Sequence, residues 1–530
     1  MKRALCMGAL FLACLAPLAA CGDDDAAPGV CLDASVDGSP VIVPEVDAGP
    51  LLRDALAPEI ATPPPRRTTL TLLRSSGSAR FVGVTTGANP HVAYLVQNKT
   101  GTFDLEVVPV TGGAPIVLQT GLNLFAGDGA LVRGGVLAWY AGVNPSRQAP
   151  SIHLWSVVAG AKTVNTPTVA GMFWASDDGA RVAFSANAKA DSTDVAVTTM
   201  ATASADIPAL AGANAMNLAV PALDCPSQLG FRASNFIGAY CTGVLETETQ
   251  PRLVTVGPDG TAVVRLDNAV SANRFDGTWI ADTTGTKLLV NHAAAGAHLI
   301  DASATATTAV GTIAKVDSAT MLPDGSALLY LAAGKLEKAT IASPPVITDV
   351  LPSGVDRFFA VTKDSKTLLY AKTNVGGLAD VFALDLSAAT PTPRALRDTA
   401  TNVFLGLTGT QSHAFVVDTN PQSSRVYAVP LEGGAPVLLV DRVHSLAGGL
   451  DFEPSPVSTG LVFTIESSVV TGTALERSAL GYVDAVKGGG LEPAATILRA
   501  QDERGAWAGD TYVFRDLGTK PGIYALTLPP

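Results

Sequence analysis

Histidine, serine and acidic side chains would build a catalytic or metal site, and here they form no established motif. His292 and His298, in the segment NHAAAGAH, are the closest pair among the six histidines. Their spacing falls across a predicted hairpin turn, so two imidazoles could face a metal ion, although ordinary loop histidines fit the spacing better. The chain lacks the His-Glu-x-x-His zinc motif, the Gly-x-Ser-x-Gly nucleophile elbow and a phosphate-binding glycine loop. We therefore assign no catalytic, cofactor-binding or metal residue and expect no cofactor.

The cysteines offer a second kind of chemistry. Cys225 lies in LDCPSQLGF and Cys241 in IGAYC. A disulfide between them would close a loop of about 15 residues and stabilise the fold by roughly 3 kcal/mol. Because an exported protein meets an oxidising compartment, we expect this disulfide rather than two free thiols. Cys31 has no evident partner.

The N-terminus is organised as an export signal. Lys2 and Arg3 precede an apolar run, and small residues then lead to Cys21. The run is too short for a membrane span, which needs about 20 residues. The segment LAAC (18–21) resembles the lipobox of bacterial lipoproteins, which implies that residues 1–20 are removed and that the Cys21 thiol carries a lipid (a palmitate-type diacyl anchor). Ordinary secretion, with an incidental Cys21, is the alternative.

The same resemblance bears on the cellular location. Gly22 is not the Asp that usually retains a lipoprotein in the inner membrane, so the resemblance implies an outer-membrane anchor in the bacterial cell envelope. The protein would then face either the periplasm or the cell exterior.

Residues 21–67 predict a disordered tether that follows the lipidated cysteine. They are rich in Pro, Asp and Ala and show no sustained apolar period. Such a segment cannot bury enough apolar surface to offset its ordering entropy. Fully extended, it would reach on the order of 150 Å at about 3.3 Å per residue.

Composition indicates an all-β domain after the tether. The chain is 47% hydrophobic and 15% charged, with 51 Gly and 35 Pro, which favours short strands separated by turns. The net charge of −12 disfavours nucleic acid or an anionic membrane surface as a partner, because both attract basic patches.

A repeated phrase predicts the architecture. The segment WASDDGARVAFSAN (174–187) has a turn pair followed by an apolar triplet, which reads as strand, tight turn and second strand. Ten copies align by a large apolar residue, at spacings of 40 to 56 residues. The aligned residues are Tyr94, Trp139, Phe184, Tyr240, Val290, Tyr330, Tyr370, Phe415, Phe463 and Phe514. Such a period predicts a β-propeller of about 8–10 four-stranded blades over residues 68–530.

The repeat resembles the TolB-like, or WD40-like, propeller repeat. That family's phrase runs Ser-Pro-Asp-Gly, a basic residue, an apolar strand and then Asp-Ile-Tyr. It is approximated by SDDGAR (176–181), LPDG (322–325), DVF (380–382) and SRVY (424–427). The resemblance covers about residues 68–530 with degenerate copies, and it implies the fold without an activity. Asp178 and Asp324 are expected to cap their own turns.

The two ends of the repeat region suggest how a ring would close. The last copy stops at GIYALTLPP, after its third strand, while TTLTLLR (68–74) is a strand without a blade. Pairing the two would hide both strand edges. We expect one large ring closed by this pairing, with three or four apolar side chains of residues 68–74 buried. Two rings are the alternative.

These features predict a lipid-anchored, non-catalytic propeller that binds or scaffolds a protein or glycan partner in the cell envelope. The alternative is a hydrolase or lyase whose active site is assembled from several blades in the central channel. Converging acidic, basic or metal-binding side chains at the channel would favour the enzyme. An exposed apolar patch would favour the binding protein.

The lipid anchor is directly testable. The Cys21→Ser variant has no thiol to acylate, so it should remain unprocessed or appear as a soluble form. Mass spectrometry of the N-terminal peptide and membrane fractionation would measure this. A variant that is processed and membrane-bound like the parent would contradict the lipoprotein interpretation.

Overall fold

The computed structural model describes most of the chain after residue 67. It covers residues 68–188, 194–200, 209–210, 228–241, 251–267, 279–292, 296–303, 310–313, 316–373, 379–397, 402–418, 424–443, 452–471, 473–486, 492–500 and 504–529. The signal segment and tether predicted for residues 1–67 lie outside this part. All described residues belong to the compact unit formed by residues 48–530.

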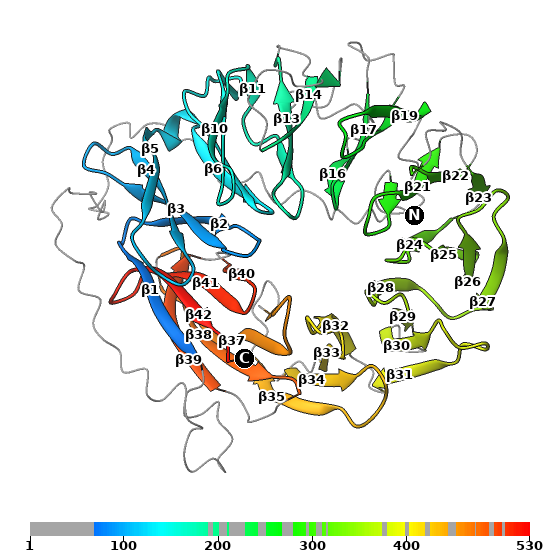
Figure 1. Ribbon diagram of the computed structural model, residues 1–530. Coiled ribbons are helices and arrows are strands. Elements are labelled where there is room, and N and C mark those ends of the chain that lie inside the picture. The colour runs from blue at the N-terminus through cyan, green and yellow to red at the C-terminus, as the bar shows by residue number, and fades with distance from the viewer. Residues whose placement is uncertain are drawn as a thin grey trace, which may run out of the picture. The chain divides into compact units, whose positions relative to one another are not determined.

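Ten four-stranded antiparallel sheets make up the described part of the chain, together with one two-stranded sheet. The four-stranded sheets form the blades of a single β-propeller ring (Figure 1). The predicted all-β propeller is thus confirmed, as one ring with ten blades. The described residues include one short 3-10 helix, η1 (Leu124–Ala126). None of the helices in this part is long and apolar enough to cross a membrane.

Each blade contributes one strand to each of four positions, from the inside of the ring outward. The first strands are β2 (Arg80–Val84), β6 (Gly129–Arg133), β12 (Phe173–Ala175), β16 (Gln228–Arg232), β20 (Trp279–Ala281), β24 (Ser318–Met321), β28 (Arg357–Val361), β32 (Asn402–Leu407), β36 (Phe452–Pro454) and β40 (Ala506–Ala508). The second strands are β3 (His91–Gln97), β7 (Val136–Tyr140), β13 (Arg181–Ala186), β17 (Asn235–Cys241), β21 (Lys287–His292), β25 (Ala327–Ala332), β29 (Thr367–Thr373), β33 (His413–Asp418), β37 (Gly460–Val469) and β41 (Thr511–Asp516).

The outer half of each blade follows the same order. The third strands are β4 (Phe103–Pro109), β9 (Ile152–Ser156), β14 (Asp194–Thr199), β18 (Pro251–Val256), β22 (Gly296–Asp301), β26 (Lys335–Thr340), β30 (Ala379–Asp385), β34 (Ser424–Pro430), β38 (Leu475–Asp484) and β42 (Gly522–Thr527). The fourth strands are β5 (Ile116–Leu122), β10 (Gly160–Val164), β15 (Ala209–Leu210), β19 (Ala262–Asp267), β23 (Gly311–Ile313), β27 (Ile347–Leu351), β31 (Pro393–Arg397), β35 (Val437–Val443), β39 (Glu492–Ala500) and β1 (Thr69–Ser75). The blades are numbered 1 to 10 from the one that begins with β2, and the two-stranded sheet pairs β8 (Gln148–Ala149) with β11 (Thr168–Val169).

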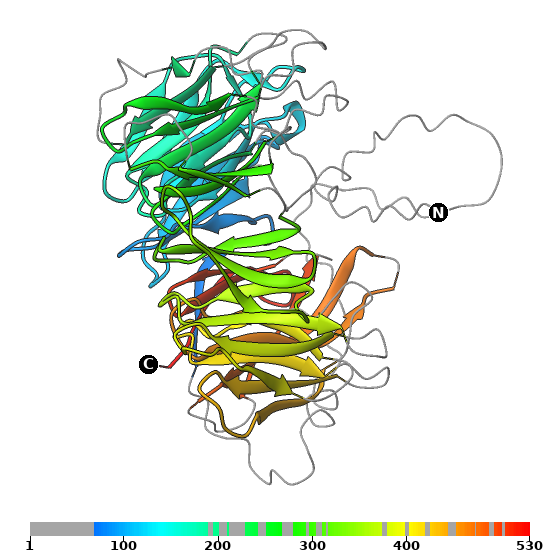
Figure 2. The same ribbon diagram turned by 90° about the vertical axis from the view of Figure 1, so that its right-hand side faces the viewer.

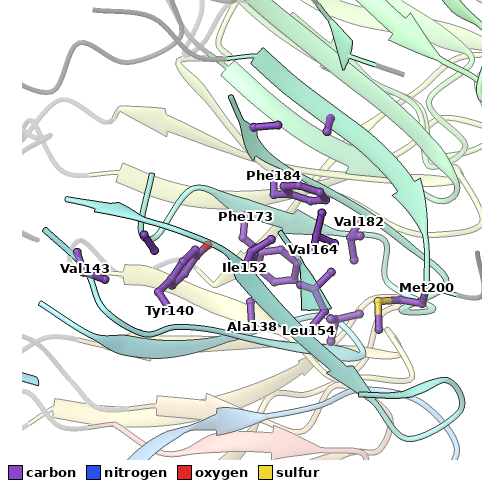
Figure 3. Close-up of a cluster of buried hydrophobic side chains, with 14 residues drawn as sticks. Ala138, Tyr140, Val143, Ile152, Leu154, Val164, Phe173, Val182, Phe184 and Met200 are labelled. Carbon is purple, nitrogen blue, oxygen red and sulfur yellow. The ribbon is translucent and has the colours of Figure 1, made fainter. Parts of the chain in front are cut away.

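The repeat predicted from the sequence corresponds to the second strands. All ten aligned residues, from Tyr94 to Phe514, lie on strands in this position. Second strands are paired on both edges, so large apolar residues there pack between neighbouring sheets. Figure 3 shows this between blades 2 and 3, where Tyr140 and Ile152 meet Phe173, Val182 and Phe184. Each of these five side chains is at most 1% exposed, and such burial stabilises the fold by roughly 1.5–3 kcal/mol per side chain.

The turn between the first and second strands is stabilised by its own side chains. Asp178 Oδ1 accepts a hydrogen bond from Ser176 Oγ at 2.6 Å, and Ser176 Oγ accepts one from the Arg181 backbone N–H at 2.9 Å. In blade 6, Asp324 Oδ1 accepts from the Ser326 N–H at 2.9 Å. Asp178 and Asp324 therefore cap their own turns, as predicted.

These first-to-second-strand turns also join one blade to the next, and we call them the turn belt. They contain only two to six residues each. Hydrogen bonds of this belt between described residues of different blades include Thr86 N to Gly134 O (2.9 Å), Arg181 Nη1 to Ser234 O, Asn235 Nδ2 to Thr284 O (2.7 Å), Thr283 Oγ1 to Pro323 O (2.6 Å), Asp324 N to Ser365 Oγ (3.1 Å), Lys363 N to Gln411 Oε1 (2.6 Å), Gly409 N to Ser458 O (2.8 Å) and Ser455 Oγ to Asp510 Oδ1 (2.9 Å).

Between blades 2 and 3 the belt depends on close backbone approach. Gly134 has φ of +54°, and a Cβ there would lie 2.6 Å from the Ser176 carbonyl oxygen. A Cβ on Gly179 would lie 2.9 Å from the Gly135 Cα. Neither space nor backbone conformation admits another residue at these positions. The glycines of the repeated phrase therefore serve packing between blades as well as the turn itself.

The ring closes through β1. This strand pairs antiparallel with β42, from Thr69 opposite Thr527 to Ser75 opposite Gly522, with a bulge between Leu72 and Arg74. The first described strand thus supplies the fourth strand of the last blade (Figure 1). The predicted closure is confirmed.

Two buried carboxylates from the neighbouring blades hold the ends of β1. Glu492 Oε1, on β39 of blade 9, accepts hydrogen bonds from the Thr68 backbone N–H at 2.9 Å and from Thr68 Oγ1 at 2.7 Å. Glu106 Oε1, on β4 of blade 1, accepts from Arg74 Nη2 at 3.1 Å. Glu492 is 1% exposed and Glu106 is 6% exposed. Burial and the charge of Glu106 also raise the pKa of Tyr94 above its usual range.

The expectation that β1 buries three or four apolar side chains is wrong. Leu73 is 8% exposed, whereas Leu70 is 38% and Leu72 is 45% exposed. As a fourth strand β1 lies at the outer edge of its sheet, so alternate side chains reach solvent. Backbone pairing, the two carboxylates and the burial of Leu73 in the apolar cluster between blades 10 and 1 together hold this strand.

Deleting residues 68–75 should open the ring. The deletion exposes the edge of β42 and leaves the buried Glu106 carboxylate without the partly exposed Arg74, which costs about 1–3 kcal/mol. That cost is large against a total stability of about 5–15 kcal/mol. We expect aggregation or a broadened, lower-temperature transition in differential scanning calorimetry.

Deletion of residues 522–530 should have the same effect, because both segments belong to one blade. Deletion of residues 22–60 is the control and should leave the transition unchanged. If only one of the two end deletions harms the fold, the ring does not close by joining its ends.

Candidate functional site

Most of the predicted cysteine chemistry falls outside the part of the chain that the structure describes. Cys21, Cys31 and Cys225 are all outside it. Cys241 is the last residue of β17, and its side chain is not described. The lipid on Cys21 and the Cys225–Cys241 disulfide therefore remain predictions.

The two close histidines lie on neighbouring strands but not opposite each other. His292 ends β21, while His298 on β22 pairs with Val290. The His298 Nδ1 atom lies 3.3 Å from Thr312 Oγ1. Over the described residues, no three His, Cys, Asp or Glu side chains come together in a way that could hold a metal ion.

The first strands form the inner wall of the ring (Figure 1). Their residues are mainly apolar. Across the ten first strands, Glu453 is the single acidic residue and there is no histidine. Aromatic rings join neighbouring blades here: Phe359 and Phe404 stack with their centroids 5.0 Å apart. Four first strands also carry an arginine at one end, namely Arg80, Arg133, Arg232 and Arg357.

Three arginines also lean over aromatic rings of the following blade. Their pairs are Arg133 over Trp174 (6.0 Å), Arg181 over Phe231 (5.9 Å) and Arg232 over Trp279 (5.6 Å). Each contact contributes on the order of 0.5–2 kcal/mol. The same kind of contact recurs at each boundary between consecutive blades from blade 2 to blade 5. These guanidinium groups therefore stabilise packing between blades.

The two faces of the ring are built differently. One carries the turn belt and the turns between third and fourth strands. The other carries the second-to-third-strand turns and the described connections between blades, and we call it the loop face. The long hairpin β37–β38, orange in Figure 2, stands out from the ring on this face. Loops held on a rigid scaffold are the usual place for binding residues.

One feature of the loop face is an exposed aromatic residue on a firmly held turn. Phe125, in η1, is 83% exposed. The Asn123 side chain caps the turn by accepting from the Ala126 N–H at 3.3 Å. Asp128 accepts from the Asn123 N–H at 2.9 Å and from the Val143 N–H at 3.0 Å. The Phe125 ring is therefore presented to solvent without the ordering cost of a flexible loop.

A second feature is a recess between blades 9 and 10, which we call the arginine recess. It is small, with room for no more than about one water molecule. It is lined by Leu480, Ile497, Arg499, Arg504, Gly505, Tyr512, Phe514 and Arg515. Arg499 and Arg515 each lie one residue before the end of their strands, β39 and β41, and Arg504 lies in the connection between these two blades, so all three lie toward the loop face.

The base of the arginine recess is an ionic network. Arg499 Nε donates to Glu476 Oε1 at 2.6 Å, and Ser478 Oγ donates to the same oxygen at 3.2 Å. The Arg499 and Glu476 side chains are 6% and 8% exposed. Nearby, burial raises the pKa of Asp516, although backbone N–H groups of Leu498 and Gly518 donate to it.

The sequence did not reveal either feature. The arginine recess takes its residues from β38, β39, the following connection and β41, so it exists only after two blades pack together. Arg499, Arg504 and Arg515 lie close together in the sequence, and this proximity alone does not predict a shared recess. Phe125 lies in the segment NLFAGDG, whose Asn and Gly-Asp-Gly predict a turn but not its exposure.

Comparisons with known proteins concern the fold. No family model and no curated protein matches the sequence. The structure is similar to a putative TolB from Agrobacterium tumefaciens (15% identity over 51% of this chain and 95% of that chain, TM-score 0.26). It is also similar to prolyl oligopeptidase B from Galerina marginata (9% identity, 83% and 56%, TM-score 0.38) and to an oligogalacturonate lyase in complex with manganese (9%, 56% and 86%, TM-score 0.34). These neighbours share the propeller fold.

The ionic base of the recess yields a stability prediction. Glu476→Gln leaves Arg499 buried beside a neutral amide, so the free energy of unfolding should fall by about 3–5 kcal/mol. The matched control is Asp349→Asn, which breaks the exposed Lys335–Asp349 pair (3.8 Å) and should cost less than about 1 kcal/mol. Urea titrations followed by tryptophan fluorescence would measure both. Equal effects of the two substitutions would show that Glu476 does not hold a buried charge.

Proposed function

We propose that the chain is a lipid-anchored, non-catalytic β-propeller that binds a protein or glycan partner in the bacterial cell envelope. Its Cys21 lipid would insert into the outer membrane, and residues 22–67 would carry the ring away from the bilayer. The ring would then act as a rigid platform, in the periplasm or at the cell surface.

The difference between the two faces of the ring supports this proposal. The turn belt ties the blades together by hydrogen bonds, so one face is devoted to rigidity. The loop face presents Phe125 at 83% exposure on a capped turn. Solvent-exposed aromatic residues with a fixed conformation are the typical anchors of interfaces.

The chemistry of the described inner wall also fits binding better than catalysis. First-strand side chains such as Phe359, Phe404 and Trp174 make apolar and cation–π contacts between blades. No observation in this part of the chain favours the hydrolase or lyase alternative, so it is not proposed.

Two matched substitutions test which face binds the partner. Phe125→Glu places a charge on the loop face, whereas Val158→Glu does so in the β9–β10 turn of the other face, where Val158 is 98% exposed. Losing a buried phenylalanine contact costs roughly 1.5–3 kcal/mol, which weakens binding about tenfold or more. Immobilised parent and variants would be incubated with envelope extract, and the retained proteins and glycans quantified by mass spectrometry.

We expect at least one species that the parent and Val158→Glu retain equally and Phe125→Glu loses. Thermal unfolding would verify that all three proteins fold alike. Retention that is equal for both variants, or no retained species, would contradict the proposed function.

A further inference from the structure

Four exposed side chains on the loop face of blades 1 and 2 make up a surface that we call the basic loop patch. They are one aromatic ring and three cations, namely Phe125, Arg80, Lys99 and Arg147. Arg80 begins β2, Lys99 lies in the β3–β4 turn, and Arg147 lies between β7 and β8. The two blades that carry these residues are neighbours in the ring (Figure 1).

Hydrogen bonds tie the Phe125 turn to the loop of blade 2. Asp128, two residues after η1, accepts from the Val143 backbone N–H at 3.0 Å. The segment that follows Val143 carries Arg147, whose backbone N–H donates to the Asn144 carbonyl oxygen at 2.9 Å. Phe125 and Arg147 therefore belong to one fixed surface rather than to two independent loops.

The two cations of blade 1 are fixed to the same surface. Asp104 Oδ1 accepts from the Gly121 N–H at 3.1 Å, which joins the strand after the Lys99 turn to the end of β5. The Arg80 guanidinium lies over the Phe103 ring, 4.8 Å from its centroid.

Phe103 also connects Arg80 to the Phe125 turn. It belongs to the apolar cluster between blades 1 and 2, and Leu124 of η1 packs against that cluster. The cation–π contact limits the freedom of the Arg80 side chain, so less entropy is lost when it binds a ligand.

The three cations of the patch are available to a ligand. Over the described residues, none of them takes part in an ion pair. The two carboxylates of the same loops, Asp104 and Asp128, are half-buried and accept hydrogen bonds from backbone N–H groups. In a chain with a net charge of −12, this patch therefore offers exposed donors for the oxygens of an acidic ligand.

The composition of the patch matches a sugar better than a protein. Of the large apolar residues that are exposed in the described part of the chain, Phe125 alone lies on the loop face, and the others lie on fourth strands or on turns of the opposite face. A protein interface needs several apolar residues at its core. A sugar ring needs one aromatic face, because its C–H groups pack against the negative face of the π-system. Exposed amide and hydroxyl groups surround the ring, from Asn123, Asn144 and Ser146.

We propose that the basic loop patch binds an acidic glycan, a sugar chain that carries carboxylate or sulfate groups. Phe125 packs against one sugar ring, while Arg80, Lys99 and Arg147 bind the acidic groups of that ring and its neighbours. Arginine binds such groups with two parallel hydrogen bonds, and lysine binds them as a point charge. This inference rests on the proposed function and specifies the chemistry of the partner.

Fluorescence polarisation with the full-length protein tests this inference. The probes are fluorescein-labelled oligomannuronate, which carries carboxylates, and a labelled heparin oligosaccharide, which carries sulfates. Labelled poly-L-glutamate of similar length supplies negative charge without sugar, and labelled dextran supplies sugar without charge. The variants are Phe125→Ala, Arg80→Gln and Arg147→Gln. The matched control is Lys363→Gln, which removes an exposed cation from the turn belt on the opposite face.

The parent should bind at least one acidic glycan more tightly than poly-L-glutamate and dextran. Each of the three variants should raise the Kd about three- to tenfold, because a stacked ring or a charged hydrogen bond is lost, while Lys363→Gln should bind like the parent. Tighter binding of oligomannuronate indicates a uronate, and tighter binding of heparin indicates a sulfated sugar. Absence of binding, equal binding of poly-L-glutamate, or unchanged binding in the three variants would each overturn the inference.

The outcome separates this inference from the proposed function. If neither acidic glycan binds but Phe125→Glu abolishes partner retention, the inference is wrong and the binding function stands. If an acidic glycan binds through the patch but no species is retained from the envelope extract, the glycan surface stands and the envelope-partner proposal fails.

Discussion

Backbone pairing between β1 and β42 is the interaction on which the ring depends. The ten blades form a circle only if the last one receives its fourth strand from the start of the described chain. Glu492 of blade 9 and Glu106 of blade 1 hold the two ends of that strand through Thr68 and Arg74. Burying a carboxylate without its hydrogen-bond donors raises the free energy of the folded state, so both carboxylates disfavour an open ring. The seam thus combines these polar contacts with the apolar cluster that Leu73 of β1 shares with blades 10 and 1.

The closed ring in turn determines where binding can occur. The turn belt needs short turns and close glycine contacts, so its residues are committed to joining blades. The loop face carries the Phe125 turn and the arginine recess. Rigidity on one face thus leaves the other available for recognition, and this division supports a binding module more than a channel-centred enzyme.

Much of this fold could be predicted from the sequence because its signals are local. A turn pair followed by an apolar triplet identified the second strand of all ten blades, and the unpaired segment at residues 68–74 identified the closing strand. The interactions that hold that strand in place could not be predicted. Its leucines alternate between the core and solvent, and its carboxylate partners lie 32 and 424 positions away from Arg74 and Thr68. The arginine recess was missed for the same reason, since only the packing of blade 10 on blade 9 assembles it.

Hydrogen–deuterium exchange of the intact protein tests the single closed ring most directly. Peptides that cover β1 would be compared with peptides that cover β5, the fourth strand of blade 1, under the same native conditions. If β1 completes blade 10, its amides that pair with β42 should exchange as slowly as the paired amides of β5. Complete exchange of β1 within seconds, while β5 stays protected, would contradict the closed ring and the account of its seam.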